Sequence, residues 1–165
     1  MIQGVWSFLL SKYTGNPQVE YGVTVSGRPG DLPNSENRVG LFINTIPLAT
    51  KVDSQLPIID WLQSIQKGHT HAREYQYTSL TRIKEWVDIK KDWFDTILIF
   101  ENYPISEVID EKNRLLKVEN VIVQEQSNFL LTIAVGVGDE LSLALRYNDQ
   151  LLDIYYVNML SLIHI

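Results

Sequence analysis

The spacing of apolar residues along the chain predicts alternating helices and strands. Over residues 2–13 apolar side chains recur at intervals of three and four, the pattern of an amphipathic helix. Gly15-Asn16-Pro17 follows and should end this helix. Over residues 19–25 apolar and polar residues alternate, which predicts a strand. Residues 27–37 are dense in turn-forming residues and should form a loop.

The middle of the chain continues this alternation. Residues 39–48 are mostly apolar and predict a buried strand, with the polar pair Asn44-Thr45 set inside it. Apolar residues at helical spacing predict a long helix over 58–72 and a short one over 80–87. Residues 94–100 are apolar on both faces of an extended chain, so they predict a further buried strand.

The last third predicts more strands and a closing helix. Strands are expected over 118–123, 130–137 and 141–147, with Gly138-Asp139-Glu140 as the hairpin turn between the last two. The order of elements favours a mixed β-sheet flanked by helices, in the α/β or α+β class. With 165 residues and no evident linker, the chain should form one domain or part of one.

Both ends of this pattern look cut. The chain begins inside a helical repeat and ends in the apolar run 159–165. The last six residues, Leu-Ser-Leu-Ile-His-Ile, also match the translated end of a transposon adapter used in sequencing libraries. We therefore expect 1–159 to be a folded segment truncated at both ends, and 160–165 to be translated adapter. The alternative for these last residues is the end of an ordinary amphipathic helix.

Composition narrows the classes of function. The net charge of −6 and the isoelectric point near 5.0 argue against a nucleic-acid binder, which needs clustered cations. The sequence has no cysteine, which excludes disulfides and thiolate metal sites and suits a reducing, cytoplasmic compartment. No apolar run reaches the roughly 18 to 20 residues of a membrane helix, so we expect no membrane contact.

The usual catalytic residue types form no convincing group. His69 and His71 are two apart in a predicted helix and therefore point in different directions, and His164 lies in the suspect tail. Gly136-Val137-Gly138 resembles the start of a phosphate loop, but a strand follows it where a helix is required. The acidic residues single out no carboxylate pair. We therefore predict no catalytic residue and no metal ligand in this chain.

Polar residues at the strand ends are the unusual feature. Ser26-Gly27-Arg28 ends one predicted strand, and Asn44 interrupts the next. A buried amide or guanidinium group needs hydrogen-bond partners, because an unsatisfied one costs roughly 1 to 3 kcal/mol. From spacing alone, a structural network is favoured over a direct functional role.

Three segments resemble one protein family. They are Tyr-Gly-Val-Thr-Val-Ser-Gly-Arg-Pro at 21–29, Val-Gly-Leu-Phe-Ile-Asn-Thr-Ile-Pro-Leu at 39–48 and Phe-Asp-Thr-Ile-Leu-Ile-Phe-Glu-Asn-Tyr-Pro at 94–104. In order and spacing they are similar to the C-terminal half of a nonribosomal peptide synthetase condensation domain, over roughly residues 2–159. Residues 73–80 stand where the family has a His-Gln-Asp-x-Pro-Phe-like motif, of which they share only Gln76.

This resemblance implies a fold and a reaction. The fold would be a chloramphenicol-acetyltransferase-like α/β lobe, one half of a two-lobed domain. The reaction would be acyl transfer, in which an acceptor amine attacks a donor thioester to form an amide. The partners would be peptidyl carrier protein domains bearing phosphopantetheine, the N-terminal lobe of the same domain and an adjacent adenylation domain, with no cofactor bound directly. The family's His-His-x-x-x-Asp-Gly motif is absent from the sequence, so the chain should be inactive alone.

The resemblance also implies supporting roles for four residues. Ser26 and Gly27 would form part of the floor of the substrate tunnel. Arg28 would pair with the motif aspartate or a neighbouring polar group, and Asn44 would hydrogen-bond along the tunnel wall. Three alternatives stay open: an epimerisation or cyclisation relative, a non-catalytic module that recruits a carrier protein, and a stand-alone protein with an unrelated role.

Overall fold

The computed structural model describes residues 1–28, 33–34, 37–88, 93–101, 127–137 and 140–162. They belong to two compact units, Met1–Ile99 and Phe100–Ile165. In chain order the described elements are α1 (Ile2–Thr14), β1 (Gln18–Val25), β2 (Asn44–Lys51), α2 (Ile58–Arg73), α3 (Leu80–Trp86), β3 (Thr96–Glu101), β4 (Leu131–Val137), β5 (Leu141–Tyr147) and α5 (Ile154–Leu162). Because the boundary between the units falls inside β3, no linker separates them in sequence.

The first unit contains a mixed sheet with β1 at its centre. β1 pairs antiparallel with β2, in a register that runs from Gln18 opposite Lys51 to Val25 opposite Asn44. On its other edge β1 pairs in parallel with β3. β1 is almost entirely buried, as expected for a strand with neighbours on both sides.

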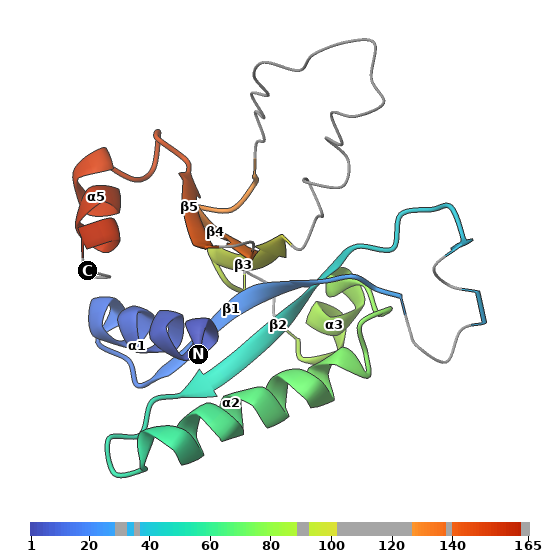
Figure 1. Ribbon diagram of the computed structural model, residues 1–165, viewed down its shortest axis with the longest axis horizontal. Helices are drawn as coiled ribbons and strands as arrows, with labels where there is room; N and C mark the ends of the chain where they lie inside the picture. The colour runs from blue at the N-terminus through green and yellow to red at the C-terminus, as the bar shows by residue number, and fades with distance from the viewer. Residues whose placement is uncertain (29–32, 35–36, 89–92, 102–126, 138–139, 163–165) are drawn as a thin grey trace. The chain divides into compact units, whose positions relative to one another are not determined.

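Helices α1 and α2 cover one face of β1 and β2 (Figure 1). Tyr21 and Leu48 are opposite one another in the register, so their side chains share a face of the sheet. The Tyr21 hydroxyl donates to the Gln3 carbonyl oxygen of α1. A Cβ atom on Gly68 of α2 would lie 4.0 Å from Leu48. The core of this unit therefore lies between the sheet and these two helices.

The second unit contains a hairpin and a helix. β4 and β5 pair antiparallel from Leu131 opposite Tyr147 to Val137 opposite Leu141. β4 is largely buried, whereas β5 is mostly exposed. Arg146 on β5 forms an ion pair with Glu101, with 3.1 Å between nitrogen and oxygen.

Most predicted elements are confirmed. The helices expected over 2–13, 58–72 and 80–87 correspond to α1, α2 and α3, and the strands expected over 19–25, 94–100, 130–137 and 141–147 correspond to β1, β3, β4 and β5. Gly15 ends α1 in the left-handed conformation, with φ of 69°. The mixed sheet flanked by helices confirms the predicted fold class.

The predicted buried strand over 39–48 is wrong in its first half. β2 begins only at Asn44, and Val39, Leu41 and Ile43 before it are exposed. The strand pairing ends at Val25 opposite Asn44, and Gly27 just beyond it has φ of 62°, which is not a strand conformation. Without a partner strand, an apolar run cannot continue the sheet.

Some predictions lie outside the described residues. They are the strand over 118–123, residues 29–32 and 35–36 of the loop over 27–37, the turn residues 138–139 and the last three residues of the tail. α5 extends over the first residues assigned to the adapter, and Leu160 in it is 8% exposed. Among the described helices, none is long and apolar enough to span a bilayer.

Candidate functional site

The predicted polar residues lie at the end of the first unit where β1 finishes and β2 begins. Gly27 is buried and adopts a left-handed conformation, with φ of 62°. A Cβ atom at this position would lie 1.7 Å from the carbonyl oxygen of Phe42. Only glycine fits, because both the positive φ and the close backbone approach exclude a side chain. The turn after β1 is therefore packed directly against the segment that leads into β2.

Arg28 contacts the same segment. Its guanidinium carbon lies 4.2 Å from the centre of the Phe42 ring, within range of a cation–π interaction. Its Nη1 donates to the carbonyl oxygen of Arg38 at 3.1 Å. Arg28 therefore links the turn after β1 to the approach to β2 through a stacking contact and a hydrogen bond. Ser26, beside them, is exposed.

Asn44, the first residue of β2, joins the sheet to the loop between α2 and α3. Its Nδ2 donates to the carbonyl oxygens of Gln76 and Thr78, at 2.9 and 2.8 Å. Its Oδ1 accepts the backbone N–H of Thr45 at 2.9 Å. Both hydrogens of the amide nitrogen are thus already engaged by the protein backbone. We call this set of contacts the Asn44 clamp.

The loop held by the clamp has buried and exposed residues in alternation. Gln76 and Thr78 are 8% and 7% exposed, whereas Tyr77 between them is 72% exposed. Ser79 follows as the N-cap of α3, where its Oγ accepts the backbone N–H of Arg82. Gln76 Oε1 is buried and has no hydrogen-bond partner among the described residues.

The histidines are not part of this group. His69 is half-buried on α2, and its Nδ1 accepts a hydrogen bond from the Gln3 side-chain amide of α1 at 3.0 Å. Burial lowers the pKa of His69 below its ordinary value, and the positive charge of Arg73 lowers it further. His71 is exposed, and its Nδ1 lies 3.3 Å from Oε2 of Glu74. The two rings do not form one site, as their spacing predicted.

A buried tyrosine completes the polar contacts under α1. The Tyr21 hydroxyl lies 3.1 Å from both the Ser7 Oγ and the Gln3 carbonyl oxygen. Burial raises the pKa of Tyr21 to about 12, although the Ser7 hydrogen bond acts in the opposite direction. Tyr21 is therefore a neutral structural residue at ordinary pH.

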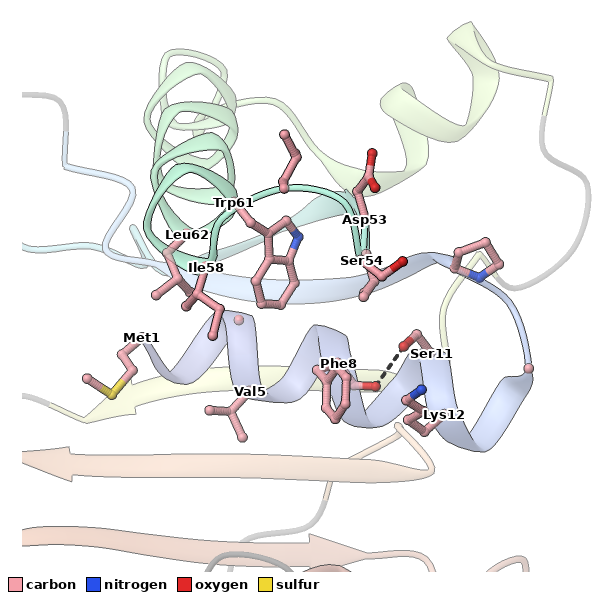
Figure 2. Close-up of a pocket in the computed structure, with 15 residues that line it drawn as sticks. Met1, Val5, Phe8, Ser11, Lys12, Asp53, Ser54, Ile58, Trp61 and Leu62 are labelled. Carbon is pink, nitrogen blue, oxygen red and sulfur yellow. Dashed lines mark hydrogen bonds between the residues drawn. The ribbon is translucent and has the colours of Figure 1, made fainter.

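A separate groove lies at the opposite end of β2. Its volume is about 780 Å³, and it lies between α1 and the connection from β2 into α2 (Figure 2). Val5, Phe8, Ile58 and Trp61 are among its apolar lining residues. Neither His69 nor His71 lines it. Its charged lining residues are Lys12 and Asp53.

The predicted site residues Gly27, Arg28 and Asn44 make contacts between chain segments. The described residues contain no group of three or more metal-ligating side chains. Arg28, Asn44 and Gly27 hold chain segments together, and none of the contacts given above pairs a nucleophile with a base. Together, these contacts hold three chain segments against one another: residues 27–28, 38–44 and 76–78.

Sequence reasoning identifies some of these residues and misses others. It points to Gly27, Arg28 and Asn44, but it assigns Phe42 to a buried strand and not to a stacking contact with Arg28. The carbonyl acceptors at Gln76 and Thr78 leave no signature in sequence, because every residue carries a carbonyl group. The one sequence signal for the residue that stacks on Arg28 is an aromatic side chain, Phe42, two positions before Asn44.

A comparison with models of protein families shows which family the chain belongs to. The family model for the condensation domain matches residues 1–161. This chain belongs to the condensation-domain family. The family predicted from the three motif segments is therefore confirmed.

Relatives among curated proteins are large synthases. The condensation-domain chain is 39% identical over 151 residues to a linear gramicidin synthase of Brevibacillus parabrevis, covering 90% of this chain and 2% of that protein. It is 34% identical over 161 residues to bacitracin synthase 3 of Bacillus licheniformis, covering 96% of this chain and 2% of that protein. The chain thus spans a few per cent of the length of these relatives.

Solved structures share the fold. A four-domain nonribosomal peptide synthetase bound to AMP and glycine matches with a TM-score of 0.77 and 19% identity, over 95% of this chain and 13% of that one. The first condensation domain of the CDA synthetase matches with a TM-score of 0.68 and 16% identity, over 97% of this chain and 35% of that one. The predicted condensation-domain fold is thereby confirmed.

Proposed function

We propose that this chain is the C-terminal lobe of a condensation domain that forms amide bonds. The donor would be an acyl or peptidyl group on one carrier protein, and the acceptor an aminoacyl group on another. The acceptor nitrogen attacks the thioester carbonyl, the new carbon–nitrogen bond forms, and the thiol of the donor phosphopantetheine leaves with a proton. Phosphopantetheine thus reaches the domain as part of its substrates.

One observation carries this proposal more than any other. The segments 21–29 and 39–48, which match family motifs in sequence, contact each other at one end of the first unit, and the second of them also holds the loop at 73–80. Gly27 and Arg28 contact Phe42, and Asn44 holds the loop that carries Gln76. A family match over residues 1–161 supports the same assignment.

The chain contributes structure and not the reactive imidazole. It lacks the His-His-x-x-x-Asp-Gly motif that the resemblance places in the N-terminal lobe. In our proposal Ser26 and Gly27 form part of the tunnel floor, and Arg28 and Asn44 hold its wall in place. The N-terminal lobe, two carrier domains and an adenylation domain would be its partners. Residues 160–165 would remain outside the functional lobe.

The test compares the chain alone with an assembled domain. By assembled domain we mean this chain expressed together with an N-terminal lobe that carries the histidine motif. Donor-loaded and acceptor-loaded carrier proteins are added, and dipeptidyl carrier is measured by mass spectrometry. We expect product from the assembled domain and none from the chain alone. A co-purifying assembled domain that forms no product, or product from the chain alone, would contradict the proposal.

A second candidate, left open by the sequence, is a non-catalytic module that recruits a carrier protein. The same experiment separates the two. Carrier binding by the chain, without product when the N-terminal lobe is supplied, would support the recruiting module. Epimerised or heterocyclic product would instead assign the chain to an epimerisation or cyclisation relative.

A further inference from the structure

The Asn44 clamp determines what Asn44 can do. An amide nitrogen has two hydrogens, and both are donated to backbone carbonyl oxygens, at 2.9 and 2.8 Å. The amide oxygen accepts the N–H of Thr45. A substrate would have to break one of these bonds to receive a hydrogen bond from Asn44. Donation of a hydrogen bond to substrate is therefore a poor explanation for this residue.

The clamp holds the loop on both sides of one residue. Its two acceptors belong to Gln76 and Thr78, which are buried, and Tyr77 between them is 72% exposed. The loop backbone is held further because the N–H of Thr78 donates to the carbonyl oxygen of Tyr75 at 2.9 Å. The Tyr77 side chain is therefore fixed at its base and exposed at its ring.

The same end of the unit carries other exposed apolar groups. Leu41 and Ile43, which lead into Asn44, are 93% and 55% exposed. An exposed aromatic ring with a hydroxyl group, on a loop whose backbone is bonded to the residue that follows these aliphatic side chains, suits a ligand with both apolar and amide groups. A carrier-bound aminoacyl or acyl pantetheine thioester has this chemistry.

We infer that Asn44 is a positioning residue that holds the α2–α3 loop so that Tyr77 contacts the carrier-bound thioester substrate. This inference rests on the proposed function, because it takes its substrate class from it. Asn44 acts on the backbone of the loop, and Tyr77 makes the contact with substrate.

The first experiment is a double-mutant cycle in the assembled domain, with Asn44→Asp, Tyr77→Ala and both together. Asn44→Asp keeps the size of the side chain but removes both donated hydrogens. We expect each single variant to lower kcat/KM about tenfold, mainly through KM for one of the two loaded carriers. The double variant should be no worse than either single variant, because both remove the same contact.

Matched controls separate this effect from general loss of structure. Asn16→Asp changes an exposed amide whose Oδ1 accepts the N–H of Gln18, a bond that the carboxylate keeps. Tyr13→Ala removes another exposed tyrosine, on α1. Both controls should keep wild-type KM values. Tyr77→Phe shows whether the ring alone is sufficient.

A second measurement tests the Asn44 clamp without an activity assay. Hydrogen exchange of the loop amides in the chain should be about tenfold faster in Asn44→Asp and unchanged in Asn16→Asp. Unchanged exchange in Asn44→Asp would overturn the clamp. Multiplicative effects in the cycle, or a wild-type KM in Tyr77→Ala, would overturn the link between Asn44, Tyr77 and substrate.

The inference can fail separately from the proposed function. If the wild-type assembled domain makes no amide, the proposed function fails, and binding of an aminoacyl pantetheine amide decides the inference. Weaker binding of this analogue in both Asn44→Asp and Tyr77→Ala than in the wild type supports it. Equal binding in all three, or no binding to the wild type, overturns it.

Discussion

At the scale of single residues, Gly27 and Gly15 have nearly the same backbone conformation but different surroundings. Their φ angles are 62° and 69°. A Cβ atom at Gly27 would lie 1.7 Å from a backbone oxygen, whereas one at Gly15 would have no heavy atom within 4 Å. Comparing the two positions therefore separates the free-energy cost of a side chain in the left-handed conformation from the cost of a steric clash.

Replacing these glycines with alanine should have unequal effects on stability. Gly15→Ala should lower the free energy of unfolding by about 1 kcal/mol, because only the left-handed conformation is penalised. Gly27→Ala should lower it by about 3 kcal/mol or more, because the turn must also move away from Phe42. Urea denaturation followed by circular dichroism measures both, and equal losses would contradict the packing described for Gly27.

Thr50 on β2 is a position where we expect a substitution to raise the free energy of unfolding. It is 6% exposed, and its Oγ1 is buried without a hydrogen-bond partner among the described residues. Thr50→Val keeps the shape and removes the unsatisfied hydroxyl, so the free energy of unfolding should rise by about 1 kcal/mol. Thr132→Val is the matched control: Thr132 Oγ1 donates to Ser127 Oγ at 2.9 Å, so this variant should lose about 1 kcal/mol. Denaturant melts of both variants give the comparison.

At the scale of elements, α1 and α2 are joined by the hydrogen bond between Gln3 and His69. The His69 ring must be neutral at Nδ1 to accept the Gln3 amide proton. Burial holds the pKa of His69 in the folded chain below 6.5, its ordinary value, which applies to the unfolded chain. As pH falls, the unfolded chain therefore binds the proton first, so this contribution to stability is present above pH 6.5 and lost below it.

The expected pH profile can be measured directly. Between pH 7.5 and about 5.5 the free energy of unfolding should fall more steeply in the wild type than in His69→Gln, which cannot bind the proton. His71→Gln changes an exposed histidine on the same helix and serves as the control. Chemical denaturation at a series of pH values tests this, and a His69→Gln profile parallel to the wild type would be the contrary result.

Elements were easier to predict than their ends and contacts. α1, α2 and β1 follow from periodicity, because each has regularly spaced apolar residues in the sequence. The strand expected from residue 39 failed because apolar composition cannot reveal that the partner strand ends at Val25. At the candidate site, Arg28 and Asn44 were recognisable by residue type and family motif. Their partners were not, because two of those partners are backbone carbonyl groups from distant positions.

At the scale of the whole molecule, exposed apolar residues should make the isolated chain associate with itself. Val39, Leu41 and Ile43 are each more than half exposed and lie together in sequence. The net charge of −6 opposes association at neutral pH, and this repulsion should weaken near the isoelectric point of about 5.0. The exposed segment and the charge therefore act in opposite directions.

Polar substitutions should reduce this association. The double variant Leu41→Ser/Ile43→Thr should sediment as a smaller species than the wild type at equal concentration, because the apolar contact area is removed. Leu151→Ser, at a 72% exposed position elsewhere in the chain, should behave as the wild type. Sedimentation velocity over a range of concentrations measures this. Identical profiles for wild type and double variant would place the association elsewhere.

The clamp made by Asn44 also bears on how this protein can be altered. Asn44 donates hydrogen bonds to main-chain oxygens, which all twenty amino acids supply. The identities of the residues around Tyr77 can therefore change while these hydrogen bonds are kept. This explains how the segment 73–80 can depart from the family motif everywhere except Gln76 and still be anchored. Protein engineers could therefore use position 77 as a site for randomised libraries, while position 44 has to stay asparagine.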